Sequence, residues 1–191
     1  MKITLGTGNE HKVFEINTIV KSLGFDNIDF MPAPKGFNPI EDGDSFEDNS
    51  FIKAKEASLM TGMISLADDS GLCIEALNGA PGLYSARYAG SQDEKIARVL
   101  NELDGIDNRK AKFVCSMTLV DKDGNILHRT KGECHGQIIK ERKGVNGFGY
   151  DPIFLPDGYD ITLAEMTEEG KNSISHRGRA LRAMLEFVDK L

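Results

Sequence analysis

The chain lacks the features that organise disulfide-rich and membrane-spanning proteins. It has 3 cysteines in 191 residues, an odd number with no CxxC spacing, which excludes a disulfide framework as the organising principle. No apolar run approaches the length that crosses a bilayer, and the run after Met1 is too short for a signal peptide. We therefore expect a soluble, cytoplasmic protein with no membrane contact.

Positive charge is also scarce. The sequence holds 23 Lys and Arg residues against 30 Asp and Glu residues, a formal net charge of −7. Broad electrostatic attraction to a nucleic-acid backbone is therefore not expected, and no nucleic acid is predicted as a partner. A protein of this charge that acts on phosphates needs a local basic site or a bound cation.

What is present is the composition of a folded globular protein. Hydrophobic residues make up 40% of the sequence and charged residues 28%, unlike a disordered chain. No internal repeat, low-complexity tract or Pro/Ser-rich linker divides the sequence. We expect a single domain over residues 1–191.

Apolar spacing predicts that helices alternate with strands near both ends of the chain, while a hairpin lies in the middle. Helical spacing and capping residues predict helices at 10–23, 45–60, 92–103 and 173–191. Short apolar runs predict strands at 3–5, 64–67, 111–120 and 126–134, the last two joined by a turn. This order indicates an α/β fold with a mixed sheet rather than a purely parallel one.

The segment from Gly6 to Lys12 lies between a predicted strand and a predicted helix. Its glycines would let a phosphate approach the backbone, and a helix N-terminus attracts anions. Lys12 falls in the first turn, where its charge opposes the helix dipole unless an anion lies beside it. The segment fits neither the GxGxxG pattern nor the P-loop pattern, so an ordinary strand-to-helix turn remains the alternative.

Asp68 and Asp69 directly follow a predicted strand. Adjacent carboxylates repel each other unless a cation or hydrogen-bond donors compensate, and strand alternation indicates that only one of the two faces a site. Oxygen ligands of this kind suit Mg²⁺, and Glu41, Asp42 or Asp44 could add another carboxylate. The alternative is an Asp-rich turn.

Two later segments carry an aromatic ring and basic side chains. In the segment 146–152, Phe148 lies between two glycines, where its ring could stack on a base while Asp151 accepts from a ring N–H. The alternative is that Phe148 belongs to the core. The segment 171–177 gathers Lys, His and Arg near the start of the last helix, which suits an anion or a base carbonyl, or a solvated surface turn.

Other polar residues favour ordinary structural roles. Asn49, Lys53 and Glu56 are spaced i, i+4 and i+7, a stripe that is typical of a solvated helix face. Cys134 and His135 have no second cluster at metal-ligand spacing and are interpreted as hairpin residues. No GxSxG or Cys–His signature occurs, so covalent catalysis has no support.

Taken together, these segments supply the parts of a nucleoside triphosphate site: a phosphate-binding turn, carboxylates for a cation, a platform for a base and a second basic corner. Five motifs in this order make the chain closely resemble the inosine triphosphate pyrophosphatase family. They span nearly the whole sequence and are TGNxxK at 7–12, ADDSGL at 67–72, GAPG and YSARY at 79–88, GFGYDP at 147–152 and SHR at 175–177.

The resemblance implies an elongated, two-lobed α/β fold with a mixed central sheet flanked by helices and an active site in the cleft. It also implies hydrolysis of dITP, ITP and XTP to the nucleoside monophosphate and diphosphate, with Mg²⁺ as cofactor. Members of this family usually form homodimers, so a homodimer is expected here.

By the same resemblance, Asp69 is the general base and a metal ligand, and Lys53 matches a lysine that contacts substrate. Many members carry two consecutive acids two and three residues before the glycine that is Gly43 here. This chain has Ile40 and Glu41 at those positions and so keeps only one of the two acids, and the metal contact is assigned to Glu41. The remaining residues implied to bind substrate are Thr7, Gly8, Asn9, Glu10, His11, Lys12, Ser70, Phe148, Gly149, Tyr150, Asp151, Lys171, His176 and Arg177.

Selectivity is expected to depend on position 6 of the purine, which is a carbonyl in inosine and xanthine and an amino group in adenine. Donors from the backbone of 148–151 or from His176 and Arg177 would pair with the carbonyl and be left unpaired by adenine. Two alternatives stay open: a pyrophosphatase for other modified or pyrimidine nucleotides, and a nucleotide sensor that has lost hydrolysis. Intact Asp69 and Lys12 argue against the sensor.

Overall fold

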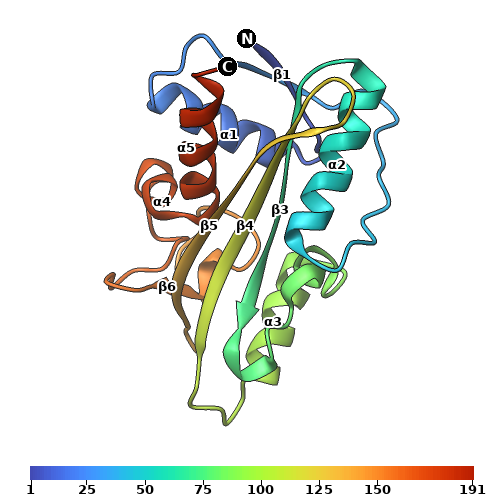
Figure 1. Cartoon of the computed structure of the whole chain (residues 1–191). Helices are drawn as coiled ribbons and strands as arrows, with labels where there is room; N and C mark the ends of the chain where they lie inside the picture. The colour runs from blue at the N-terminus through green and yellow to red at the C-terminus, as the bar shows by residue number, and fades with distance from the viewer. The chain divides into compact units, whose positions relative to one another are not determined.

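A computed structural model describes all 191 residues apart from the side chain of Glu10, so the role predicted for that side chain lies outside the described residues. The strands and helices are shown in Figure 1. In chain order they are β1 (Lys2–Leu5), α1 (Glu10–Ser22), β2 (Asp29–Pro32), α2 (Phe46–Thr61), β3 (Ser65–Ile74), α3 (Gln92–Glu102), β4 (Lys110–Val120), β5 (Ile126–Ile138), β6 (Phe154–Pro156), α4 (Glu168–Ile174) and α5 (His176–Val188).

The six strands form one mixed sheet in the order β2-β1-β3-β4-β5-β6. Strand β1 is parallel to both β2 and β3, whereas β6 is antiparallel to β5. The predicted α/β class with a mixed sheet is therefore confirmed. No helix in the described chain combines the length and the apolar character that a membrane span requires.

The chain divides into two compact units. Unit 1 comprises residues 1–69, 115–132 and 177–191, and unit 2 comprises residues 70–114 and 133–176. Strands β3, β4 and β5 each contribute residues to both units. The expectation of a single domain stays a prediction, and the units are described one at a time.

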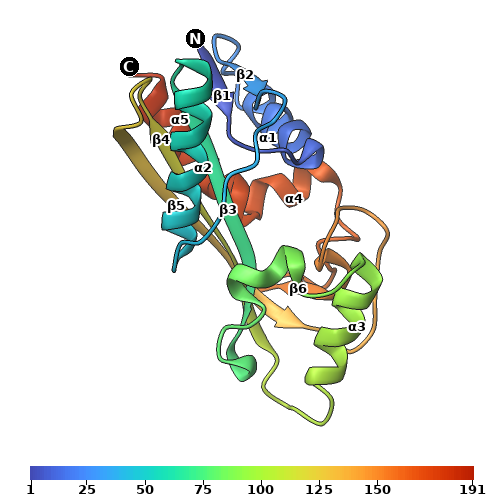
Figure 2. The same ribbon diagram turned by 90° about the vertical axis from the view of Figure 1, so that its right-hand side faces the viewer.

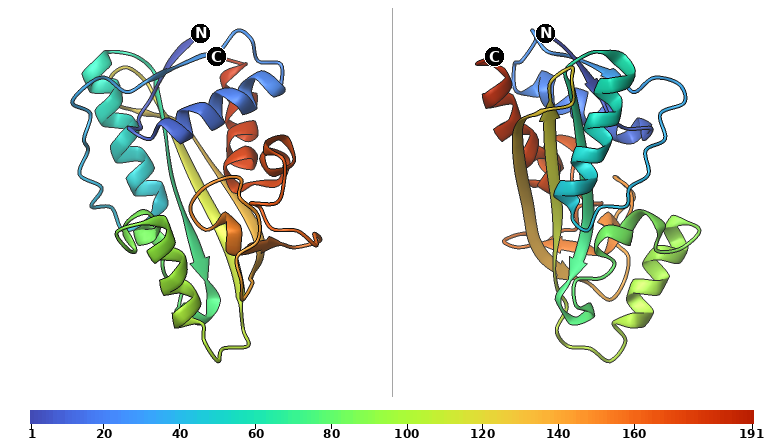
Figure 3. Two further views of the ribbon diagram at one scale, coloured as in Figure 1. Left: turned by 180° about the vertical axis from the view of Figure 1, so that it is seen from behind. Right: turned by 45° about the vertical axis from the view of Figure 1, so that its right-hand side comes forward.

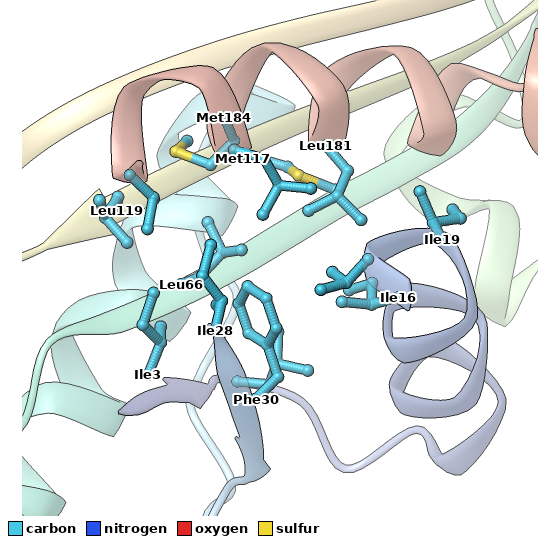
Figure 4. Close-up of a cluster of buried hydrophobic side chains, with 14 of the residues drawn as sticks. Ile3, Ile16, Ile19, Ile28, Phe30, Leu66, Met117, Leu119, Leu181 and Met184 are labelled. Atoms are coloured by element: carbon cyan, nitrogen blue, oxygen red, sulfur yellow. The ribbon is translucent and has the colours of Figure 1, made fainter. Parts of the chain in front are cut away.

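Unit 1 is a layered structure in which the two faces of the strands bury different helices. Helices α1 and α5 pack on one face, where Ile16 and Leu181 meet Leu66 in the core drawn in Figure 4. Helix α2 packs on the other face, where Ala54 meets Ala67. Figures 1 and 3 show this separation of α2 from α1 and α5. Leu66 and Ala67 are neighbours on β3, so the alternation of side chains along the strand sets the two faces.

Unit 2 has a separate core built around α3. Ile96 and Val99 of this helix pack with Leu72 of β3 and with Phe113 of β4. The rings of Phe113 and Phe154 lie 4.7 Å apart. Figure 2 shows α3 beside the segment that follows β3.

The predicted helix boundaries are confirmed where a local cap defines them. The side chain of Asn9 accepts hydrogen bonds from the first turn of α1, and that of Ser45 accepts from the backbone N–H of Asp48 in α2. Gly62 ends α2 in a left-handed conformation with φ 65°, which glycine adopts without strain. The predicted hairpin is confirmed as β4 and β5.

Two sequence predictions of secondary structure were wrong, and two strands were not predicted. Strand β3 does not stop before Asp68 but continues to Ile74, because pairing within the sheet outweighs the weak strand propensity of Asp, Ser and Gly. The last helix is interrupted at Ser175, whose φ of −64° and ψ of 154° are extended, so α4 and α5 are separate. Strands β2 and β6, which are 4 and 3 residues long, were not predicted.

Candidate active site

Asp68 and Asp69 lie on opposite faces of β3. Asp68 lies two residues after Leu66 and therefore on the same face of β3, where it contacts α1 and α5. Asp69 lies two residues after Ala67, on the other face, and contacts α2. The register of β1 and β3, with Leu5 opposite Leu66, brings the start of the loop after β1 beside these aspartates. The two carboxylates therefore belong to two different groups of side chains, both within unit 1.

The Asp68 group is a buried ion network. The Lys12 Nζ lies 3.1 Å from Asp68 Oδ2, and the Nε and Nη2 atoms of Arg177 donate to the same oxygen at 3.3 Å. Arg177 is only 1% exposed, and its Nη1 donates to the buried carboxylate of Glu15. Burial alone would raise the pKa of Asp68, but the charges of Lys12 and Arg177 outweigh it and hold that pKa well below its usual range. The surroundings of Asp68 thus favour its ionised form.

This network resolves the sequence clue at Lys12. A lysine in the first turn of a helix opposes the dipole unless an anion compensates. In unit 1 the Asp68 carboxylate lies beside Lys12 and compensates its charge. A substrate phosphate at Lys12 stays a prediction.

The Asp69 group is smaller and more accessible. The Lys53 Nζ donates to Asp69 Oδ1 at 3.0 Å and to Glu41 Oε2 at 2.8 Å. Asn49 Nδ2 donates to the other Asp69 oxygen, Oδ2, at 3.3 Å. Burial raises the pKa of Asp69 more than the charge of Lys53 lowers it, so the net shift is upward. Burial opposes the charge of Lys53 as well, but Asp69 and the other nearby carboxylates outweigh it and raise its pKa.

Asn49 and Lys53 were interpreted from sequence as part of a solvated helix face, and this was wrong. The two residues are 2% and 7% exposed and both contact Asp69. Their i, i+4 spacing places them on the α2 face that covers β3. The spacing itself was the available signal, because one face of a helix can hold two donors for one carboxylate. Glu15 was also missed: it lies three residues after Lys12 and just before the buried Ile16.

The donor set of the Asp69 group fits a hard divalent cation. Glu41 and Asp69 share the Lys53 ammonium and stay partly exposed, with side-chain exposures of 33% and 13%. Mg²⁺ commonly takes one or two carboxylates and completes its shell with water and phosphate oxygens. Throughout the described part of the chain, no three or more His, Cys, Asp or Glu side chains form a metal-binding group, so no cage made of protein alone is available there. Two carboxylates with a substrate phosphate would be the appropriate set.

The loop from Thr7 to Lys12 is stabilised by its own side chains. Thr7 Oγ1 accepts from the Asn9 N–H, and Asn9 Oδ1 accepts from the N–H groups of His11 and Lys12. These amides are therefore engaged in capping α1. A side chain could not replace Gly6 at the start of the loop, because an added Cβ would lie 2.8 Å from the Lys53 carbonyl oxygen. Gly8, Asn9 and His11 are exposed.

In unit 2, Phe148, Asp151 and Lys171 form a second group. Asp151 Oδ2 accepts from the Phe148 N–H at 2.9 Å and from Lys171 Nζ at 2.8 Å. The same Lys171 ammonium lies 4.6 Å from the centre of the Phe148 ring, a cation–π contact. The ring is half-buried. The arrangement fixes the orientation of an aromatic surface beside a charged pair. The role of this surface as a base platform stays a prediction.

Of the other predicted residues of unit 2, Tyr150 and His176 have structural partners. Tyr150 is buried, and its hydroxyl donates to the Ser85 carbonyl oxygen at 2.9 Å. The His176 ring stacks on Phe113 with centres 4.8 Å apart. Ser70 is half-buried, and Gly149 has a positive φ of 64°. Substrate contact by these four residues stays a prediction.

A model of the Ham1 family matches residues 3–187, almost the whole sequence. The chain belongs to the Ham1 family. This confirms the resemblance found in the five motifs.

Relatives of this Ham1-family chain cover it from end to end. A protein of Desulforamulus reducens named dITP/XTP pyrophosphatase is 44% identical over 197 residues, which cover 100% of this chain and 97% of the relative. The solved structure of a HAM1 protein from Coxiella burnetii has a TM-score of 0.88 at 38% identity, with 100% of both chains covered. A nucleoside-triphosphatase / dITP/XTP pyrophosphatase from Mycobacterium abscessus has a TM-score of 0.75 at 40% identity, covering 96% of this chain and 97% of that one.

Proposed function

We propose that this Ham1-family chain hydrolyses the non-standard purine nucleoside triphosphates dITP, ITP and XTP to the nucleoside monophosphate and diphosphate. The relatives named dITP/XTP pyrophosphatase support the substrate class, since the similarity covers both chains almost completely. The observation that carries the chemistry is the grouping of Asp69, Lys53 and Glu41 beside the loop after β1.

In the proposed reaction a water molecule attacks the α-phosphorus, and the bond from that phosphorus to the oxygen bridging the α- and β-phosphates breaks. The water gives its proton to the Asp69 carboxylate, and diphosphate leaves with the bridging oxygen. Lys53 donates to Oδ1 of Asp69 and so keeps at the site the carboxylate that would accept the proton. Lys12 and Lys53 offset the negative charge that develops on the phosphate oxygens.

Glu41 and Asp69 would hold the metal ion, and metal dependence is part of this proposal. When bound there, Mg²⁺ would neutralise phosphate charge and make nearby water more acidic. Because both carboxylates already bond to Lys53, the lysine would keep them together before substrate arrives. An acidic protein could bind a polyanion in this way without a basic surface.

Base recognition is assigned to the group in unit 2. The Phe148 ring, held beside Lys171 and Asp151, offers a stacking surface that any purine can use. Discrimination would come from donors that pair with the carbonyl at position 6 and that adenine leaves unpaired. Guanine shares that carbonyl, so its rejection would depend on position 2.

Diphosphate release from ITP, XTP, ATP and GTP, each with and without Mg²⁺, tests the proposal. We expect fast release from ITP and XTP in the presence of Mg²⁺ and little from the other reactions. Release from dUTP or methylated pyrimidine nucleotides instead would identify the alternative pyrophosphatase. Tight nucleotide binding without release would identify a sensor.

A homodimer and a cytoplasmic location complete the proposal. The homodimer is proposed from the resemblance carried by the five sequence motifs, since members of that family usually form homodimers. Size-exclusion chromatography followed by light scattering would measure a mass of twice the 21.0 kDa of one chain for a dimer. A mass of one chain at micromolar concentration would contradict it.

A further inference from the structure

The Asn49 side chain joins two parts of the proposed site that the sequence separates. Its Nδ2 donates to Asp69 Oδ2 at 3.3 Å, and its Oδ1 accepts from the backbone N–H of Gly43 at 2.9 Å. Gly43 lies two residues after Glu41, in the loop that precedes α2. One amide therefore touches both the proposed base and the loop that carries the second carboxylate.

The orientation of this amide is determined by its partners. A backbone N–H can only donate, so the atom that meets Gly43 must be the amide oxygen. The NH₂ group is then left facing Asp69, where an ionised carboxylate can only accept. The two contacts support each other, and Asn49 is buried, so water cannot readily replace either partner.

The loop fits closely against Asn49. A Cβ added to Gly43 would lie 2.6 Å from the Asp48 Cβ and 2.8 Å from Asn49 Oδ1. These distances leave no room for a side chain. The backbone of the loop is therefore held in contact with the first turns of α2.

Asn49 and Lys53 donate hydrogen bonds to different oxygens of the Asp69 carboxylate. Lys53 donates to Oδ1 and Asn49 to Oδ2, from positions one helical turn apart on α2. A carboxylate held at one oxygen can still rotate about its bond to Cβ, whereas one held at both oxygens has a fixed plane. Lys53 also reaches Glu41, so the two α2 residues together link the whole group.

We propose that Asn49 is a positioning residue that sets the plane of the Asp69 carboxylate and holds the Glu41 loop against α2. This inference rests on the proposed function, because Asp69 and Glu41 have their roles there. Loss of an outer hydrogen-bond partner of this kind typically lowers activity about 10- to 100-fold. The effect should fall on kcat, since Asn49 is not assigned any contact with the nucleotide.

Two substitutions separate the two contacts. Asn49→Asp keeps an oxygen that can accept from Gly43 but removes the donor to Asp69 and places a like charge beside it. Asn49→Ala removes both contacts. Ser50→Ala is the matched control, because Ser50 is equally buried on the same turn and bonds to Thr118 rather than to Asp69.

The kinetic test measures kcat and KM for ITP with the three variants. We expect kcat to fall at least about 10-fold in Asn49→Asp and in Asn49→Ala, with KM changed less than about 3-fold, while Ser50→Ala keeps the wild-type kcat. A wild-type kcat in Asn49→Asp would overturn the proposal. An equal fall in Ser50→Ala would also overturn it, because the loss would then come from general weakening of α2.

A second readout is independent of activity. Hydrogen exchange of the Gly43 amide, followed by NMR on the metal-free protein, should be accelerated in Asn49→Ala and stay near wild type in Asn49→Asp and Ser50→Ala. Unchanged exchange in Asn49→Ala would refute the role in holding the loop. If wild-type protein releases no diphosphate from any nucleotide, the proposed function fails, and this exchange experiment still decides whether Asn49 holds the loop.

Discussion

Two adjacent aspartates on β3 have opposite surroundings. Asp68 is buried among Lys12, Arg177 and, through Arg177, the Glu15 carboxylate. Asp69 is partly exposed and is held by one lysine and one neutral amide. The charges around Asp68 lower its pKa, whereas burial raises that of Asp69. Consecutive residues of a strand can thus serve as a fixed ion in the scaffold and as a group that is suited to accept a proton.

The largest expected effect belongs to Asp69. Asp69→Asn keeps the size of the side chain but removes the proton acceptor and one metal-binding oxygen. We expect ITP turnover to fall about 1000-fold, within the range that a general base supplies, while nucleotide binding measured by calorimetry changes little. Near-normal turnover would remove Asp69 from the role of base and erase the contrast with Asp68.

A substitution at Arg177 tests whether the Asp68 network stabilises the fold. Arg177→Met leaves the buried Asp68 and Glu15 carboxylates without the guanidinium that lies between them, and removing one partner of a buried ion pair costs about 3 kcal/mol or more. Urea unfolding should show this loss. Arg179→Met on the exposed side of α5 is the control and should stay within about 0.5 kcal/mol of wild type. If both variants unfold alike, the Asp68 network is not a source of stability.

Phe148 belongs to neither the Asp68 group nor the Asp69 group. Replacing it therefore tests whether base recognition is independent of both groups. Phe148→Ala should raise KM for every purine substrate about 10-fold, the size expected for one lost stacking contact. The ratio of turnover with and without Mg²⁺ should stay as in wild type. An unchanged KM together with lower stability would make the ring part of the core.

The smallest effect is expected at Cys115, whose Sγ lies 3.8 Å from Asp68 Oδ2. Burial and the charge of Asp68 raise the pKa of this thiol, which disfavours the reactive thiolate form. Cys115→Ala should cost about 1 kcal/mol of unfolding free energy, as for other small losses of buried volume, with wild-type turnover. Reduced turnover would show that the Asp68 carboxylate, and not only its partner Lys12, takes part in the reaction.

The sequence predicted those parts of the fold that depend on local signals. Asn9, Ser45 and Gly62 define helix ends through contacts within a few residues, and the helices predicted at 10–23 and 45–60 begin or end beside them. The continuation of β3 through Asp68 could not be predicted, because pairing with strands distant in sequence decides it. The break at Ser175 was hidden, since apolar spacing continues on both sides of it.

For the candidate site, the sequence identified residues with suitable functional groups, but it did not show which of these residues contact one another. Lys12 and Asp68 were each singled out, but nothing in the sequence indicated that they bind each other. Asn49 was assigned to a solvated face because polar stripes usually are solvated. Only the packing of α2 on β3 shows that the Asp69 carboxylate lies beneath that stripe.

The most direct test of the contrast is urea unfolding of Asp68→Asn and Asp69→Asn side by side. Asp68→Asn removes the charge that Lys12 and Arg177 share, and the account predicts a loss of about 3 kcal/mol in unfolding free energy. Asp69→Asn removes a charge whose burial is unfavourable, and Lys53 keeps Glu41, so the predicted change is below about 1 kcal/mol. Equal losses of unfolding free energy in the two variants would contradict the account, in which Asp68 stabilises the fold and Asp69 takes part in the reaction.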